Sequence, residues 1–120
     1  MRIGWGVAIW LAAGFCCVTA NAAPKHSAPT NAYSAALSKM QPADQEARLA
    51  EMVGYWCIGT QAFLMGVATT GAEAGNAYWS VACLDGSSYA VQIDPLGRPV
   101  SVPCAALADT RQGKECFKKF

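Results

Sequence analysis

Six cysteines in 120 residues constrain the fold of this chain more than any other feature of its sequence. Cys16 and Cys17 belong to an apolar N-terminal segment, and the other four lie further along the chain: Cys57, Cys83, Cys104 and Cys116. An even number of cysteines in a short exported chain is typical of a disulfide framework. We therefore predict two disulfides on these four cysteines, and no metal site.

The N-terminus predicts export. Arg2 precedes an uncharged run from residue 3 to residue 20, and Ala20 and Ala22 stand in the A-x-A order of a signal-peptidase site. Cleavage after Ala22 would make residues 1–22 a signal peptide and the protein periplasmic or secreted. The run is also long enough to span a bilayer, so an uncleaved anchor is the alternative and the only predicted contact with a membrane.

Removal of residues 1–22 leaves 98 residues, which is one domain at most, with eight basic and eight acidic side chains. This balance gives no net attraction to nucleic acid. Residues 23–31 contain two prolines and little apolar bulk, and residues 23–40 are predicted to be a flexible leader, although residues 31–40 can add a short helical turn. The leader contains the only histidine, His26, and offers nothing to hold it as a ligand or a base.

Residues 41–120 are predicted to form an α+β domain, in which one main helix packs on a small antiparallel β-meander and two disulfides join the parts. Pro42 suits the first position of the helix. An apolar stripe then recurs at spacings of three and four, which is typical of a core-facing helix: Leu49, Met52, Val53 and Trp56. Residues 62–68 fit a buried strand or a short core segment.

The meander itself is predicted from residues 77–104, where apolar residues alternate with polar or small ones. A three-residue loop at 84–86 keeps the apolar side chains of the first two strands on one face. By the same test, a four-residue loop at 95–98 would bring Val100 and Val102 to that face. Prolines in the third strand predict that it lies at a sheet edge.

Four cysteines allow three connectivities. In the predicted meander Cys83 and Cys104 lie on the outer strands, about 9–10 Å apart, whereas a disulfide needs Cα atoms within about 7 Å. This argues against Cys83–Cys104 and the Cys57–Cys116 pair that would accompany it. Of the two remaining patterns we favour the more local, Cys57–Cys83 with Cys104–Cys116, and the other stays open.

No catalytic, cofactor-binding or metal-binding residue is predicted, and we expect a non-enzymatic protein. The chain lacks C-x-x-C, H-E-x-x-H and G-x-S-x-G motifs and a glycine-rich phosphate loop. Without a positioned histidine, neither a Ser–His nor a Cys–His pair can be built. Asp85 and Asp94 fall in predicted turns, where aspartate is a common turn former.

Two groups of residues are weak candidates for binding. Tyr55 and Tyr78 stand beside Trp56 and Trp79, which we place in the core, and the tyrosines are therefore freer to stack on a sugar, a peptide or a partner. The C-terminal tail has an excess of basic residues that would suit an anionic surface: Arg111, Lys114, Lys118 and Lys119. Cys116 would hold the two phenylalanines of this tail near the domain.

The sequence resembles a pattern found in small exported bacterial proteins of uncharacterised role. The resemblance covers roughly the last 65 residues and depends on "YWSV" at 78–81, "DG" at 85–86 and "CFKKF" at 116–120. It implies a secreted or periplasmic protein and transfers no catalytic residue. The chain is also similar to PepSY-type modules, which implies a helix packed on a small antiparallel sheet.

These features predict a domain that acts by contact with an envelope protein or polymer. The alternative is a periplasmic enzyme inhibitor, which would present an exposed loop, residues 71–76 or residues 95–98, to an active site.

Overall fold

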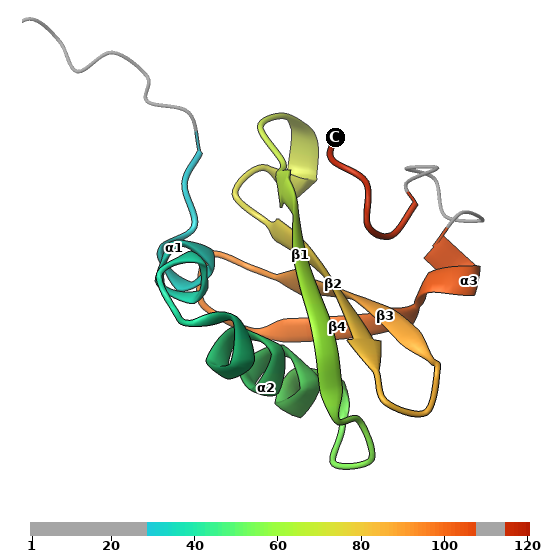
Figure 1. The fold of residues 1–120 in the computed structure, drawn as a ribbon. Helices are drawn as coiled ribbons and strands as arrows, with labels where there is room; N and C mark the ends of the chain where they lie inside the picture. The colour runs from blue at the N-terminus through green and yellow to red at the C-terminus, as the bar shows by residue number, and fades with distance from the viewer. Residues whose placement is uncertain (1–28, 108–114) are drawn as a thin grey trace, which may run out of the picture.

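The computed structural model describes residues 29–107 and 115–120, so the predicted signal peptide, His26, Arg111 and Lys114 lie outside the described residues. Four strands form one antiparallel sheet in the order β1-β2-β3-β4 (Figure 1). The predicted α+β class, with a main helix on a meander, is confirmed, with one strand more than the three expected. In chain order the elements are α1 (Ala32–Ser38), α2 (Pro42–Val53), β1 (Gly59–Val67), the 3-10 turn η1 (Gly71–Glu73), β2 (Ala77–Cys83), β3 (Ser88–Ile93), β4 (Pro99–Pro103) and α3 (Cys104–Leu107).

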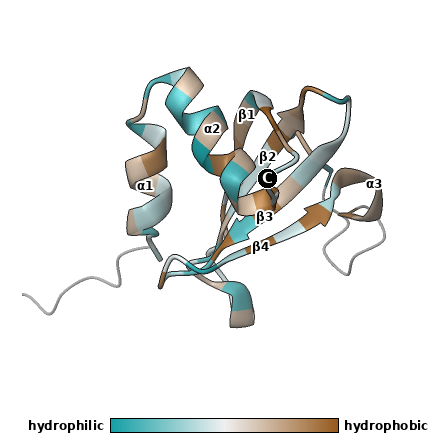
Figure 2. Ribbon diagram, turned by 90° about the horizontal axis from the view of Figure 1, so that it is seen from below, coloured by the Kyte–Doolittle hydropathy of each residue, from teal (hydrophilic) through white to brown (hydrophobic). Residues whose placement is uncertain are grey.

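The main helix, α2, begins where the sequence predicts, but it ends before the last residue of the predicted apolar stripe. Pro42 is its first residue and Gly54 follows its last, donating its backbone N–H to the carbonyl of Ala50. Figure 2 shows that α2 carries both hydrophilic and hydrophobic residues, as expected of a helix with one face on a sheet. Trp56 is half exposed, and its predicted place in the core is wrong because the helix has ended three residues earlier, at Val53.

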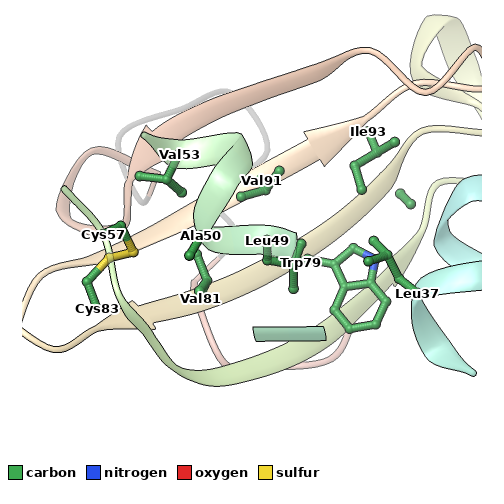
Figure 3. Packing of buried hydrophobic residues seen from close by; sticks show 11 residues of the cluster. Leu37, Leu49, Ala50, Val53, Cys57, Trp79, Val81, Cys83, Val91 and Ile93 are labelled. Carbon is green, nitrogen blue, oxygen red and sulfur yellow. A yellow bond between two sulfur atoms is a disulfide. The ribbon is translucent and has the colours of Figure 1, made fainter. Parts of the chain in front are cut away.

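The first face of the sheet carries the larger core, and α2 covers it. Figure 3 shows this core as a row of side chains that runs from the Cys57–Cys83 disulfide to Trp79. Trp79 is buried, as predicted, and its indole N–H donates to the hydroxyl of Ser34 at 2.9 Å. The row is built from α1, α2, β2 and β3: Leu37, Leu49, Ala50, Val53, Val81, Val91 and Ile93.

The second face of the sheet also carries an apolar cluster, which the sequence analysis did not foresee. Its buried members come from three strands and α3: Met65, Tyr78, Ala90 and Leu107. In the register of β3 with β4, Val102 pairs with Ala90 and therefore lies on this second face. The four-residue loop predicted at 95–98 is wrong, because it assumed that only one face was apolar.

The turn between β2 and β3 has the predicted three-residue length. Cys83 and Ser87 pair on either side of it, and Gly86 adopts a left-handed conformation with φ 90°. This length keeps Trp79 opposite Val91 on the first face. The prediction for residues 84–86 is confirmed.

The folded domain starts about ten residues earlier than predicted. Residues 32–38 form α1, and Asn31 at its N-cap is only 4% exposed. The prediction of a flexible leader up to residue 40 is therefore wrong for residues 31–40. Their small and polar composition is typical of a linker, but Leu37 packs in the core and the Asn31 side-chain amide hydrogen-bonds to two loops.

The two disulfides are Cys57–Cys83 and Cys104–Cys116, which confirms the favoured connectivity. The first joins the loop after α2 to the end of β2. The second joins α3 to the C-terminal segment. Stable disulfides fit an oxidising compartment.

Candidate binding surface

Tyr55 and Trp56 lie in the short loop between α2 and β1. Tyr55 is 99% exposed, and its ring meets that of Trp56 edge-on, with centroids 5.7 Å apart and an angle of 83° between the ring planes. The Trp56 ring lies against Gly54 so closely that a Cβ atom there would come within 2.1 Å of it. Glycine at 54 therefore lets Trp56 fold back and support Tyr55.

Two aliphatic residues lie at the same end of the molecule. Ile58 belongs to the loop of Tyr55, and Leu84 opens the turn between β2 and β3; both turns are at the lower end of Figure 1. Leu84 donates its backbone N–H to the carbonyl of Ile58 at 2.8 Å, beside the Cys57–Cys83 disulfide. We call the four exposed side chains the end patch: Tyr55 (99% exposed), Trp56 (51%), Ile58 (62%) and Leu84 (68%).

Of the four members of the end patch, only Tyr55 was predicted to be exposed; Trp56 was placed in the core, and Ile58 and Leu84 were not singled out. The signal for Leu84 was present, because a large apolar residue inside a predicted three-residue turn has no strand face on which to hide. Ile58 follows a cysteine in an uncharged stretch, so its sequence context does not indicate exposure. It is exposed because α2 ends at Val53 and leaves Ile58 in a loop.

A hollow of about 300 Å³ opens beside Tyr55, and we call it the end hollow. Its walls come from the last two turns of α2 and from the start of β1, and the Glu51 carboxylate is its only charged lining group. Gly59 lies so close to the backbone of Glu46 that a Cβ atom would come within 2.4 Å of the carbonyl oxygen. This close approach holds β1 against the helix and shapes the floor of the end hollow.

Tyr78, the second tyrosine predicted to be available for stacking, is buried on the second face of the sheet. Its ring meets that of Phe120 edge-on at 5.4 Å. Burial, together with the nearby negative charge of Glu73, raises the pKa of Tyr78 above that of an exposed tyrosine. Its prediction as an exposed binding residue is therefore wrong, and its ring is part of the packing.

The described part of the basic tail, residues 115–120, lies on the second face of the sheet. Phe117 donates its N–H to the buried hydroxyl of Ser80 at 2.9 Å, and its ring lies 6.3 Å from that of Phe63. Of the two described lysines, Lys118 pairs with Glu115 and Lys119 is exposed. The predicted role of Cys116 in holding the two tail phenylalanines near the domain is confirmed.

The predicted inhibitor loop at 95–98 belongs to a turn, residues 94–98, that is braced by the side chain of Asp94. The Asp94 carboxylate accepts the N–H groups of Leu96 at 3.0 Å and Arg98 at 2.8 Å and pairs with the Arg98 guanidinium. The Arg98 N–H is the main cause of a pKa of Asp94 below its usual range. Leu96 at the tip is 68% exposed.

A second hollow, of about 320 Å³, lies between α1, α2 and the 94–98 turn. Its lining is apolar apart from Arg48 and includes Tyr33, whose ring packs on Gly97. Within residues 29–107 and 115–120, no group of three histidines, cysteines or acidic residues is placed to hold a metal ion. In the same part of the chain, no helix has the length and hydropathy needed to cross a membrane.

No family model, curated protein or solved structure matches this chain.

Proposed function

We propose that this chain is an exported, non-enzymatic recognition domain that binds a protein of the cell envelope through the end patch. The observation that carries the proposal is that four large apolar side chains, each at least half exposed, gather at one end of a small domain. Single exposed apolar residues are ordinary on protein surfaces, but several large ones at one end of a domain are typical of an interaction site. Tyrosine and tryptophan are also enriched at protein interfaces.

The end patch is held in place before any partner arrives. The Cys57–Cys83 disulfide and the hydrogen bond from Leu84 to Ile58 join the two loops that carry it. A rigid surface loses less conformational entropy on binding than a mobile loop does. Such rigidity supports recognition by a small domain.

The proposal is tested with a triple variant, Tyr55→Ser, Ile58→Ser and Leu84→Ser, against wild-type protein. The matched control carries Tyr33→Ser and Val100→Ser, which removes exposed apolar residues elsewhere. All three proteins are immobilised and exposed separately to envelope proteins and to purified cell-wall polymer. We expect one envelope protein to be retained by wild type and control and lost by the triple variant. Equal retention of the envelope protein by wild type and the triple variant would contradict the proposal. If only the polymer were retained, and only by proteins with an intact end patch, the end patch would be assigned to a polymer.

A periplasmic enzyme inhibitor is the second candidate, and the 94–98 turn favours it. Inhibitory loops need an exposed side chain on a backbone that stays rigid, and the Asp94 carboxylate provides three contacts within the turn that presents Leu96. If this candidate holds, envelope extract will yield a single hydrolase at equimolar ratio. The substitution Leu96→Ala would then abolish inhibition, whereas the end-patch triple variant would retain it.

A further inference from the structure

We propose that the end hollow receives a basic side chain of the protein partner, arginine in preference to lysine. The inference rests on the proposed function, since it names the chemistry of the partner that meets the end patch. It depends on three properties of the end hollow: an exposed aromatic side chain at its wall, an apolar floor and a carboxylate at the rim.

The aromatic wall is the Tyr55 ring. Tyr55 lines the end hollow, and its ring meets that of Trp56 edge-on, with 83° between the ring planes. A cation is attracted to the face of an aromatic ring, and the planar guanidinium of arginine can also stack on it. The Tyr55 side chain is 99% exposed, so its ring face is open to a cation, and the Trp56 ring beside it rests on Gly54.

The floor of the end hollow suits the methylene stem of a long basic side chain. It is lined by Ala47 and Ala50 of α2 and by Ile58 and Gly59 on the β1 side. Arginine and lysine bury such stems against apolar surface while the charged head stays near water. The volume of about 300 Å³ is enough for one side chain rather than for a folded element.

The carboxylate at the rim is Glu51. Its present partner, Arg48, reaches it at 3.4 Å through Oε2 alone, and both side chains are more than half exposed. Such exposed pairs contribute little, so a partner's guanidinium can replace Arg48 and bind both carboxylate oxygens.

The surrounding charge also favours a cation. The helix α2 carries Asp44, Glu46 and Glu51 against the single cation Arg48, and Asp85 follows Leu84 in the next turn. The described lysines lie elsewhere: Lys39 at the far end of α2, and Lys118 and Lys119 in the C-terminal segment. Complementary charge of this kind directs a basic partner to the end patch and steers its approach.

The test is a titration of the purified protein with three short peptides, followed by the amide NMR signals of Glu51, Tyr55 and Ile58. The peptides are acetyl-Ala-Leu-X-Leu-Ala-amide, with X as arginine, lysine or citrulline, the last being an uncharged analogue of arginine. We expect the arginine peptide to bind most tightly and the citrulline peptide at least about threefold more weakly. Equal binding of arginine and citrulline, or shifts confined to another surface, would overturn the proposal.

Variants then assign the contact. Tyr55→Ala and Glu51→Gln should each weaken the arginine peptide about two- to fivefold, whereas Tyr55→Phe, which keeps the ring, should bind as wild type does. Tyr33→Ala and Glu115→Gln are the matched controls, and both should bind normally. A loss in the controls equal to that in the variants would refute the assignment. Concentration-dependent shifts without peptide would assign the end hollow to the tail of a second copy and also overturn it.

The two proposals fail separately. If the envelope partner depends on the end patch but binds equally after its arginines are changed to citrulline, the basic-side-chain inference fails and the proposed function stands. If the arginine peptide binds the end hollow as expected but no envelope protein depends on the end patch, the proposed function fails instead.

Discussion

Asn31 shows how one buried polar residue can decide where a domain begins. Its side-chain amide donates to the carbonyls of Gly75 and Ile93, each at 2.9 Å, and its side-chain oxygen accepts the N–H of Ser34. It therefore caps α1 and also ties that helix to two loops that are far away in the sequence. An asparagine in a polar stretch is typical of a linker, and no local sequence pattern distinguishes a linker asparagine from a buried capping one.

We expect Asn31→Ala to lower the free energy of unfolding by about 2–3 kcal/mol, because it leaves buried carbonyls without a donor and removes a helix cap. Urea denaturation followed by far-UV circular dichroism measures this loss. Gln61→Ala, at an exposed position of β1, is the control and should change stability little. Equal stability of the Asn31 variant and wild type would show that water replaces these hydrogen bonds.

We expect the buried Tyr78 to make the free energy of unfolding fall at alkaline pH. Burial raises its pKa in the folded protein, so as the pH rises the unfolded chain releases this proton first. The contribution of protonated Tyr78 is therefore fully present below about pH 10 and is lost as the pH rises through the folded-state pKa. Tyr78→Phe should reduce the decline in unfolding free energy between pH 9 and pH 11, as estimated by urea denaturation. Tyr33→Phe should not, and an identical decline in both variants would contradict the assignment.

At the scale of elements, the sequence predicted what local rules determine. The start of α2 follows from Pro42, and the turn at 84–86 follows from the need to keep one set of apolar residues together. The turn before β4 could not be obtained in this way. Val102 packs on the second face of the sheet, and the C-terminal segment that makes this face apolar joins it through Cys116, many residues later.

The same limit applies to the candidate site. Tyr55 was identified because an aromatic residue near the end of a helix is easily noticed, but its neighbours Ile58 and Leu84 come together only through the pairing of β1 with β2. Tyr78 was misplaced because its partner, Phe120, is 42 positions away and covers it from the opposite end of the sequence. The sequence of a strand does not show which of its two faces is buried until the segments that pack on each face are known.

The C-terminal segment is held on the second face by contacts that a β-bulge makes possible. The pairing of β1 with β2 shifts between Leu64 and Gly66, and the carbonyl of Met65 at this irregularity accepts the N–H of Phe120 at 3.2 Å. A bulge leaves its extra residue out of the ladder, so its backbone groups can bind something else. The Phe120 ring then packs on Gly66, where a Cβ atom would come within 2.6 Å of it.

Removal of the Cys104–Cys116 disulfide should release this segment while the rest of the sheet stays folded. In the double variant Cys104→Ser and Cys116→Ser, we expect faster hydrogen exchange at Phe117 and Phe120 and little change in β2. Because the unfolded chain regains the entropy of a 12-residue loop, the free energy of unfolding should fall by about 2.8 kcal/mol. Gly66→Ala, which displaces the Phe120 ring without touching the disulfide, should loosen the same residues to a smaller extent. Unchanged exchange in both variants would show that the segment needs neither contact.

At the scale of the whole molecule, the two disulfides serve different parts of the fold. Cys57 and Cys83 are buried in the core of the first face, and they also underlie the end patch. Cys104 and Cys116 lie at the margin of the second cluster, at the other face of the sheet. A domain of this size has a small core, and cross-links contribute a large share of its stability.

The final prediction follows from this division. Replacing Cys57 and Cys83 by serine opens a loop of 26 residues, for which chain entropy gives a loss of about 3.5 kcal/mol, and it also places two hydroxyl groups in an apolar core. We therefore expect a larger fall in melting temperature than for the Cys104 and Cys116 pair. Binding through the end patch should be lost as well, because the loops that carry Tyr55 and Leu84 are no longer joined, whereas the second pair of substitutions should leave that binding intact. If the two double variants melted at the same temperature and bound a partner equally well, the Cys57–Cys83 bridge would have no special role in either the core or the end patch.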